Sequence, residues 1–338
     1  MEYSLSNVTV QLECPSSEQE LAIGDIWSRL FHLGAGKSSQ PCIHFRVGGV
    51  RPAEISGERL FDAPGLSVTR NADGYHLTSG DSYLLVNLIR NEIAGALSHN
   101  FFSAPLENQR ALFFFAFLLV LASHGLYGVH ASGVSYRGSG MLLVAGSGCG
   151  KTTLALALVT QGWNYLSDDA VLLYHTANRE SVEACAFGRP FSCGSEIIGH
   201  FPELGSIAAD TPLLPNGKRL LEVSTLYDGQ FHTRCLPNMI LFPEIVDAPL
   251  SRLLPLTQTE ALTRLIGQGI GLLTERATVV GQLRLFEQLL MQTHSFRLLH
   301  GADVHSKPAR LATLLANALA ACRQPVAPGT QGVLAHAG

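Results

Sequence analysis

The sequence predicts an α/β domain that binds a polyphosphate, preceded by a smaller α+β domain. A glycine-rich loop at 145–153 joins the apolar run 141–144 to a helix-like segment at 154–159. The next strand-like run, 164–166, leads directly into Asp168-Asp169. Short β-like runs recur through the first hundred residues, where the alternating strand-and-helix pattern of the later chain is missing. The strand–glycine loop–helix context is what makes a phosphate-binding loop credible.

The loop reads Ala-Gly-Ser-Gly-Cys-Gly-Lys-Thr-Thr from position 145 to position 153. Glycines let backbone N–H groups turn toward phosphate oxygens, and a helix N-terminus adds partial positive charge. Lys151 is expected to reach the terminal phosphates, and the Thr152 hydroxyl is expected to hold Mg²⁺. The loop therefore predicts ATP and Mg²⁺ as cofactors. The expected nucleotide-binding residues are Gly146, Ser147, Gly148, Cys149, Gly150, Lys151, Thr152 and Thr153.

One position departs from the usual phosphate-loop pattern, which begins with glycine where this chain has Ala145. Alanine is strained there if the site needs a positive φ, and costs little if φ is negative. The alternative interpretation of the whole segment is a glycine-rich strand-to-helix turn with a chance lysine. The flanking strand and helix patterns favour the phosphate loop.

The composition excludes several classes of protein. The chain has 338 residues, of which 46% are apolar and 15% charged, which excludes wholesale disorder. A net charge of −4 with 23 Lys and Arg gives no basic footprint for nucleic acid. Seven scattered cysteines without a CxxC pair favour a reduced, cytoplasmic protein with no cysteine-based metal site. The apolar run 111–122 is too short to cross a bilayer, so we expect a buried core helix and no membrane association.

The patterns divide the chain into three parts. We expect an α+β domain over 1–105, suited to recognising a partner or substrate, a catalytic α/β domain over 106–322, and a frayed tail over 323–338. The expected strands are 8–12, 42–47, 66–69, 75–78, 131–136, 141–144, 164–166 and 170–175. The expected helices are 26–33, 88–97, 109–123, 152–161 and 307–321, and Thr257 to Glu260 has capping-box spacing.

The acidic pair Asp168-Asp169 lies seventeen residues after Lys151, at the end of the next expected strand. Neighbouring parallel strands would place both carboxylates beside the glycine loop. One carboxylate can join the Mg²⁺ shell, and the other can take a proton from an attacking hydroxyl. The bland alternative is a solvated turn, because acidic pairs are common in turns. Together with the phosphate loop, the pair favours phosphoryl transfer.

Part of the chain resembles a known family. The stretch Val129-His130-Ala131-Ser132-Gly133-Val134, followed by the loop, its helix and the strand ending in Asp168-Asp169, is similar to the HPr kinase/phosphorylase family. The later runs 187–192, 237–243 and 294–298 resemble the short HPr-kinase-related proteins, including kinases of lasso-peptide precursors. The resemblance implies a P-loop, HPr-kinase-like (PEP-carboxykinase-like) C-terminal domain.

The resemblance also implies roles for individual residues. Asp168 matches the family's catalytic carboxylate, and Asp169 matches its neighbour, which we assign with Thr152 to the metal shell. Which carboxylate takes which role stays open, since sequence cannot orient either side chain. His130 matches the family's histidine before the phosphate loop and is either catalytic or a structural hydrogen-bonding residue. Arg189 is a candidate to stabilise the transferred phosphoryl group or to form a surface ion pair.

A second polar cluster, Lys218, Arg219 and Glu222, is expected to line the same cleft as the phosphate loop. The family's acidic segment downstream of the aspartate pair is not recognisable in this chain. This difference favours kinase over phosphorylase activity. Family members often form oligomers, so the resemblance implies a homo-oligomer as well.

The expected function is an ATP-dependent serine kinase that transfers the γ-phosphoryl group to a hydroxyl of a peptide or small protein, such as a ribosomal peptide precursor. Two alternatives stay open. The first is a nucleotide-binding regulator or pseudokinase, which Ala145 and the missing acidic segment allow. The second is a small-molecule kinase, for example one that phosphorylates free serine. The size of the N-terminal domain favours a peptide or protein partner over a metabolite.

Overall fold

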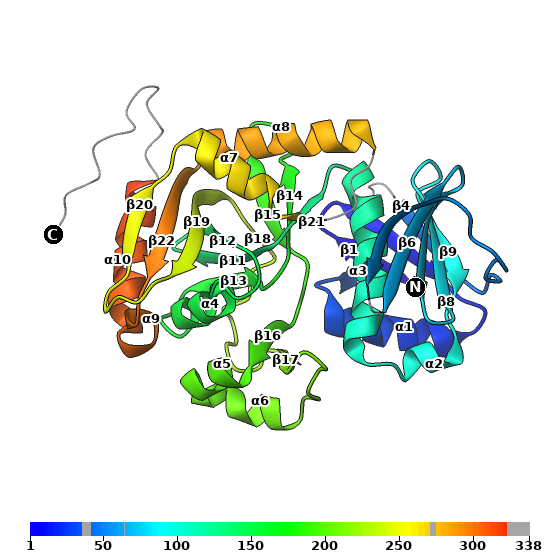
Figure 1. The fold of residues 1–338 in the computed structure, drawn as a ribbon, viewed down its shortest axis with the longest axis horizontal. Helices are drawn as coiled ribbons and strands as arrows, with labels where there is room; N and C mark the ends of the chain where they lie inside the picture. Colours follow the sequence, from blue (N-terminus) through cyan, green and yellow to red (C-terminus); the bar gives the residue numbers. More distant parts are fainter. Residues whose placement is uncertain (36–41, 64, 271–274, 323–338) are drawn as a thin grey trace. The chain divides into compact units, whose positions relative to one another are not determined.

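The computed structural model describes residues 1–35, 42–63, 65–270 and 275–322 (Figure 1). The chain divides into two compact units. The first contains Met1–Gly128 with Leu214–Asn216 and Ile270–Val279, and the second contains Val129–Leu213, Gly217–Gly269 and the chain from Val280 on. The architecture is mixed α/β with several sheets. The expected tail at 323–338 lies outside the described residues.

The first unit is built on one sheet, which has nine strands within the described residues, in the order β3-β1-β2-β4-β9-β8-β7-β6-β5. The strands are β1 Glu2–Leu5, β2 Val8–Glu13, β3 Gly34–Ala35, β4 Cys42–Val47, β5 Glu58–Ala63, β6 Leu66–Asn71, β7 Gly74–Ser79, β8 Ser82–Asn87 and β9 Glu92–Ala96. Its helices are α1 Ser17–Leu30, α2 His99–Phe102 and α3 Leu106–Ser123. Figure 1 shows α3 running along the sheet, and it packs against β6 to β9.

Aromatic side chains hold α1 and α3 against this sheet. Trp27 of α1 packs edge-on against Phe45 of β4 and against Phe113 and Phe117 of α3, with ring centroids 4.9 to 5.8 Å apart. Such pairs stabilise a core beyond the area they bury. Among the described residues, α3 is also the one helix long and apolar enough to cross a membrane, and 61% of it is buried inside the molecule.

Three sequence expectations change in the first unit. The segment 88–97 was expected to be helical, and this is wrong, because β9 pairs there with β4 and β8. Gly95 explains the difference: a Cβ at this position would lie 2.0 Å from the Tyr83 carbonyl oxygen, an approach that only glycine allows. The helix expected at 26–33 is the longer α1, which Ser16 caps by accepting from the Gln19 N–H. Helix α3 belongs to the first unit, whereas the sequence boundary at 105 placed it in the second.

The second unit is built on a mixed sheet, which has six strands within the described residues, in the order β13-β11-β12-β19-β22-β20. The strands are β11 Ala131–Tyr136, β12 Ser139–Val144, β13 Asn164–Ser167, β19 Pro237–Ile245, β20 Arg252–Pro255 and β22 His294–His300. β12, β19 and β22 run parallel, whereas β11 and β20 are antiparallel to their neighbours. This places the carboxyl ends of β12, β19 and β22 at one edge of the sheet.

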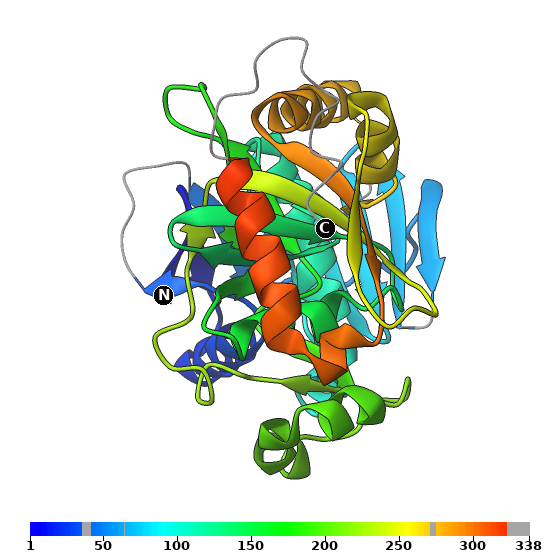
Figure 2. The same ribbon diagram turned by 90° about the vertical axis from the view of Figure 1, so that its left-hand side faces the viewer.

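Helices α4 (Lys151–Val159) and α10 (Pro308–Ala321) cover one face of this sheet. Figure 2 shows α10, in red, crossing that face. Leu154, Leu156 and Leu158 of α4 are fully buried, in a core with Leu311 and Leu315 of α10. Helix α4 is apolar on all sides, as expected for a helix packed between a sheet and another helix. It ends before Gly162, which has φ +80° as the sequence predicted.

The remaining elements surround this core. The strands are β14 Val171–His175, β15 Val182–Ala186, β16 Phe191–Gly194, β17 Lys218–Leu221 and β18 Arg234–Cys235. The helices are α5 Ser195–His200, the 3-10 turn Pro202–Leu204, α6 Gly205–Ala209, α7 Gln258–Ile266 and α9 Asp303–Ser306. The capping box predicted at Thr257 and Glu260 is confirmed at the start of α7. Three elements lie where the chain passes between the units: β10 Tyr127–Val129, β21 Gly269–Ile270 and α8 Arg276–Gln292.

We predict that Leu156→Ala lowers the free energy of unfolding of the second unit by about 2–5 kcal/mol, because it leaves a cavity where α4 packs against the sheet. Urea unfolding measures this change. Leu250, which is exposed, provides the matched control, and Leu250→Ala should change stability by less than about 0.5 kcal/mol. Equal losses in the two variants would contradict the packing described for α4.

Candidate functional site

The glycine-rich loop connects β12 to α4, and its backbone depends on two glycines. Gly148 and Gly150 have φ of +83° and +80°, in the left-handed region, and Gly150 is the N-cap of α4. Ala145 does not have a positive φ. Alanine is therefore unstrained where the usual pattern has glycine, and the departure seen in the sequence costs the loop little.

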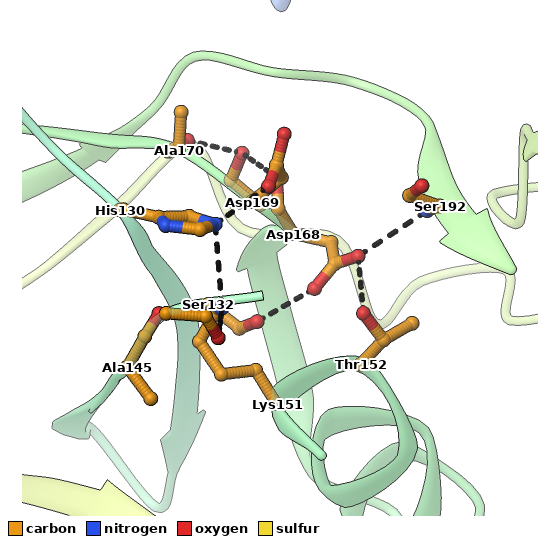
Figure 3. A network of polar contacts seen from close by, with 11 residues as sticks. His130, Ser132, Ala145, Lys151, Thr152, Asp168, Asp169, Ala170 and Ser192 are labelled. Carbon is orange, nitrogen blue, oxygen red and sulfur yellow. Dashed lines mark hydrogen bonds and ion pairs between the residues drawn. The ribbon is translucent and has the colours of Figure 1, made fainter. Parts of the chain in front are cut away.

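The side chain of Lys151, the first residue of α4, folds back under the loop. Its Nζ donates to the carbonyl oxygens of Ala145 at 2.6 Å and Gly146 at 2.9 Å (Figure 3). Burial lowers the pKa of this amine, and the charges of Asp168 and Asp169 oppose that shift. A buried ammonium held by two carbonyl oxygens can exchange these partners for phosphate oxygens.

The Asp168 carboxylate is buried, with 1% of the residue exposed, and three groups donate to it. Oδ1 accepts from the Ser132 hydroxyl at 2.6 Å, and Oδ2 accepts from the Thr152 hydroxyl at 2.8 Å and the Ser192 N–H at 3.3 Å. Burial and the neighbouring charge of Asp169 raise its pKa, while these hydrogen bonds lower it. Asp168 thus ties β11, α4 and β16 together beside the loop (Figure 3).

Asp169 lies differently, although it is the next residue. Its φ is +69°, a left-handed conformation that aspartate tolerates better than most residues. This turns its side chain, which is 34% exposed, away from Asp168 and toward His130, whose Nε2 lies 2.9 Å from Asp169 Oδ1. The adjacent carboxylates therefore meet different partners: Asp168 is enclosed by donors, and Asp169 lies at a cavity with a histidine.

His130 Nε2 lies between two partners, because Lys151 Nζ is 3.3 Å from the same atom. With a proton on Nε2, the imidazole donates to Asp169. Without that proton, Nε2 accepts from Lys151. The tautomer of His130 therefore decides whether Nε2 donates to Asp169 or accepts from Lys151.

The two carboxylates reach the loop by a route that differs from the one expected. We expected β12 and the strand ending in Asp168-Asp169 to be neighbours, but β11 lies between them, antiparallel to both. β12 and β13 are therefore still parallel and end at the same edge. The intervening strand also contributes Ser132, whose hydroxyl donates to Asp168.

Sequence reasoning missed Ser132 and His300. Ser132 follows His130 at the two-residue spacing that puts strand side chains on one face, and this signal was available. His300 lies at the end of β22, 151 residues after Cys149 of the loop, and only the parallel order β12-β19-β22 brings it close.

His300 forms a hydrogen bond with the backbone of the loop. Its Nε2 donates to the Cys149 carbonyl at 3.2 Å, and the residue is only 4% exposed. Burial lowers the pKa of the imidazole. Among the described residues, Nδ1 has no hydrogen-bond partner.

A cavity of about 490 Å³ opens beside the loop, a size typical of small-ligand sites. The predicted residues that line it are His130, Ser147, Gly148, Gly150, Lys151, Thr152, Thr153, Asp169 and Lys218. Gly146 and Cys149 instead line a second hollow of about 410 Å³ beside the loop, which Gly148 also borders. Asp168 lines neither and reaches the cavity only through Thr152 and Ser192.

The expected polar cluster is only partly brought to this cavity. Arg189 forms an ion pair with Glu222, and Arg219 donates to the Thr211 carbonyl, so these three side chains do not line it. Lys218 is the member that does. Arg189 thus takes the ion-pair arrangement that the sequence analysis left open as its alternative.

The site contains oxygen ligands suited to Mg²⁺ but no preformed metal cage. Within the described part of the chain, no group of three or more His, Cys, Asp or Glu side chains is arranged to hold a metal ion. Thr152 was expected to share a metal with Asp169, yet its hydroxyl is bonded to Asp168. A hydroxyl and a carboxylate in contact match the way Mg²⁺ binds, through one or two protein oxygens plus substrate phosphates.

Comparison with known proteins confirms the resemblance seen in the sequence. No known family profile matches the chain. The HPr kinase/phosphorylase of Chlorobium phaeobacteroides (strain BS1) is 35% identical over 75 residues, which are 22% of this chain and 20% of that protein. The HPr kinase/phosphorylase of Mycoplasmopsis pulmonis (strain UAB CTIP) is 49% identical over 51 residues, which are 15% of this chain and 16% of that protein. The chain thus matches a fifth or less of the length of these curated relatives.

A solved structure, the HPr(Ser) kinase/phosphatase from Coxiella burnetii, is also similar, with 15% identity and a TM-score of 0.30. The match covers 58% of this chain and 99% of that one. A structural match this weak does not support the resemblance, which rests on the local sequence matches. These make the matched segment HPr-kinase-like.

We predict that Gly150→Ala weakens binding of inorganic triphosphate at least about tenfold, because alanine is strained at φ +80°. An added Cβ would also lie 2.6 Å from His300 Nε2. Calorimetric titration measures the affinity. At Gly146 a Cβ meets no atom within 4 Å and φ is not positive, so Gly146→Ala should lose less. Equal losses would show that the left-handed turn at Gly150 is not what shapes the loop.

We predict that Asp168→Asn stabilises the protein against heat at pH 8. The raised pKa of Asp168 means that protonation favours the folded state, so this stabilisation is present at low pH and lost as the pH rises through that pKa. The asparagine side chain carries no charge, so the variant does not have to keep a charge buried at high pH. Its melting temperature should exceed the wild-type value at pH 8, and the difference should shrink as the pH falls, measured in chelator-containing buffers. A lower melting temperature for the variant at pH 8 would contradict this account.

Proposed function

We propose that this protein is an ATP-dependent kinase that transfers the γ-phosphoryl group to a hydroxyl, namely a serine of a peptide or small protein. One observation carries the proposal: the hydroxyl of Thr152, in the glycine loop, is bonded to the first carboxylate of an acidic pair whose second carboxylate lines the same cavity. A loop that cradles phosphates, a metal-binding oxygen pair and a reachable base are the parts that phosphoryl transfer needs.

The loop supplies the positive charge for the polyphosphate. Gly150, Lys151, Thr152 and Thr153, at the start of α4, line the cavity, and a helix N-terminus offers backbone N–H groups and the positive end of the helix dipole to an anion. Lys151 exchanges the carbonyl oxygens of Ala145 and Gly146 for phosphate oxygens when a nucleotide binds. Lys218, which lines the cavity, contributes a further cation where the sequence suggested Arg189.

The donor set fits Mg²⁺, since Thr152 and Asp168 offer a hydroxyl and a carboxylate in contact at 2.8 Å. When bound, the ion neutralises charge on the β- and γ-phosphates. The ion's charge next to Asp168 would also lower the raised pKa of this carboxyl, because a nearby cation favours the ionised form.

Asp169 is the better candidate for the base, which reverses the assignment carried over from the resemblance. A base must lie within reach of the acceptor hydroxyl, and Asp169 lines the cavity whereas Asp168 is enclosed. His130 contacts Asp169 and can share the proton that the carboxylate accepts. The catalytic work is then positioning and charge neutralisation, with one proton passed from the acceptor to Asp169.

The nature of the acceptor rests on resemblance. The curated relatives are named HPr kinase/phosphorylases, and the sequence resembles the short related proteins that include lasso-peptide precursor kinases. We therefore propose a peptide or small-protein acceptor, with residues of the first unit in its recognition, and a cytoplasmic, homo-oligomeric enzyme. Free serine is the small-molecule alternative that the assay below includes.

We predict that Asp169→Asn lowers the rate of phosphate transfer about 100- to 10,000-fold. Asparagine tolerates the left-handed conformation about as well as aspartate, so the backbone stays in place. The measurement is phosphate transfer from ATP to candidate peptides, HPr-like proteins and free serine, detected by mass. Asp168→Asn should instead raise the Mg²⁺ concentration needed for half-maximal rate.

Three outcomes would contradict the proposal. Wild-type transfer by Asp169→Asn would show that Asp169 is not the base. Unchanged Mg²⁺ dependence in Asp168→Asn would remove Asp168 from the metal shell. ATP binding without transfer to any acceptor would favour a nucleotide-binding regulator. Glu287→Gln, at an exposed residue of α8 that does not line the cavity, provides a control that removes a carboxylate outside the proposed machinery.

A further inference from the structure

Two stacked histidines line the cavity beside the loop. His200 is the last residue of α5 and His305 lies in α9, and both line the cavity. Their ring centroids are 3.6 Å apart, and the ring planes differ by 19°. In Figures 1 and 2, α5 and α9 lie at the same end of the second unit. The two imidazoles thus join walls of the cavity that come from distant parts of the chain.

The two ends of the cavity differ in chemistry. The loop end carries Lys151, Thr152 and the N-terminus of α4, groups that bind anions. The residues next to the histidines in the chain that line the cavity include the apolar Ile197, Val304 and Ala302, together with the carboxylate of Glu196. A ligand that fills both ends must therefore combine an anionic group with a flat apolar one. Pockets for heteroaromatic ligands are lined in this way, by hydrophobic and aromatic side chains with few polar groups.

The direction of the nucleotide follows from the proposed function, on which this inference rests. The transferred phosphate must face Asp169 and His130, so the nucleoside extends toward the part of the cavity away from them. Thr153, the next residue of α4, lines the cavity after Thr152. Helix α4 packs directly against α9, which contains His305. A nucleotide held by the loop is therefore led along α4 toward the histidines.

We propose that the His200–His305 pair is the stacking wall for the base of the bound nucleoside triphosphate. Flat π-systems in offset contact attract one another, and a base stacks on an aromatic side chain irrespective of its hydrogen-bonding edge. The pair accordingly supplies affinity for a nucleobase and little discrimination among bases.

The charge of His305 suits this role at neutral pH. Burial, His200 and His300 all lower the pKa of His305, and Glu196 alone opposes them. His305 is therefore an uncharged imidazole, which stacks on its neighbour without repulsion. A neutral ring also does not draw the phosphates away from the loop.

The test compares two probes, ATP and inorganic triphosphate, by calorimetric titration in the presence of Mg²⁺. His305→Ala and His200→Ala should each weaken ATP binding about tenfold and leave triphosphate binding within about twofold of wild type. Unchanged triphosphate binding also shows that the variant is folded. His305→Phe should retain ATP affinity, because it keeps a flat ring. His99→Ala, an exposed histidine of the first unit, is the matched control.

Each other result overturns the proposal. ATP affinity that survives both alanine variants would place the base elsewhere, for example in the second hollow beside the loop. Equal losses for ATP and triphosphate would show that the histidines only hold α5 and α9 in place. If wild-type protein binds triphosphate as tightly as ATP, no nucleoside contact exists although the phosphate loop functions. Absence of binding to both probes would sink the proposed kinase function itself.

Discussion

The buried carboxylate of Asp168 is the constraint on which the site depends. It accepts from Ser132 of β11, from Thr152 of α4 and from the backbone of Ser192 in β16. A buried charge without such partners would be too costly to keep. The three bonds therefore fix β11, α4 and β16 against one another, and they hold Thr152 where it lines the cavity. Its raised pKa shows that burial still outweighs this compensation, so the site is built at some expense in stability, as functional sites often are.

The left-handed backbone at Asp169 separates two carboxylates that are adjacent in sequence. An ordinary strand would also point them to opposite sides, but the sharp turn brings the second one to the cavity and to His130. One carboxylate can then hold the metal shell while the other accepts a proton. Neighbouring acidic groups in different surroundings are a common way to divide acid–base roles in one site. The two adjacent residues can therefore take different roles although only Asp169 lines the cavity.

Much of the site was predictable because its residues cluster in one stretch. The loop, Lys151 and the aspartate pair lie within 25 residues, and local pattern is enough to place them on one strand, one turn and one helix. Ser132 could have been included through its two-residue spacing from His130. The helix expected at 88–97 failed for a tertiary reason: Gly95 permits a close approach of β8 that no local pattern records. Arg189 likewise could not be assigned, because its partner Glu222 is set by the pairing of β16 with β17.

The sequence by itself determined which residue types meet at the candidate site: a glycine-rich loop, a lysine and threonine at its end, and two carboxylates after the next strand. These follow from residue types at short spacing, where chain geometry leaves little freedom. Only the tertiary structure decided which carboxylate is enclosed and which faces the cavity, because that depends on β11 lying between β12 and β13. It also decided that His300 supports the loop and that His200 meets His305, since side chains more than 100 residues apart come together only through the sheet order and helix packing.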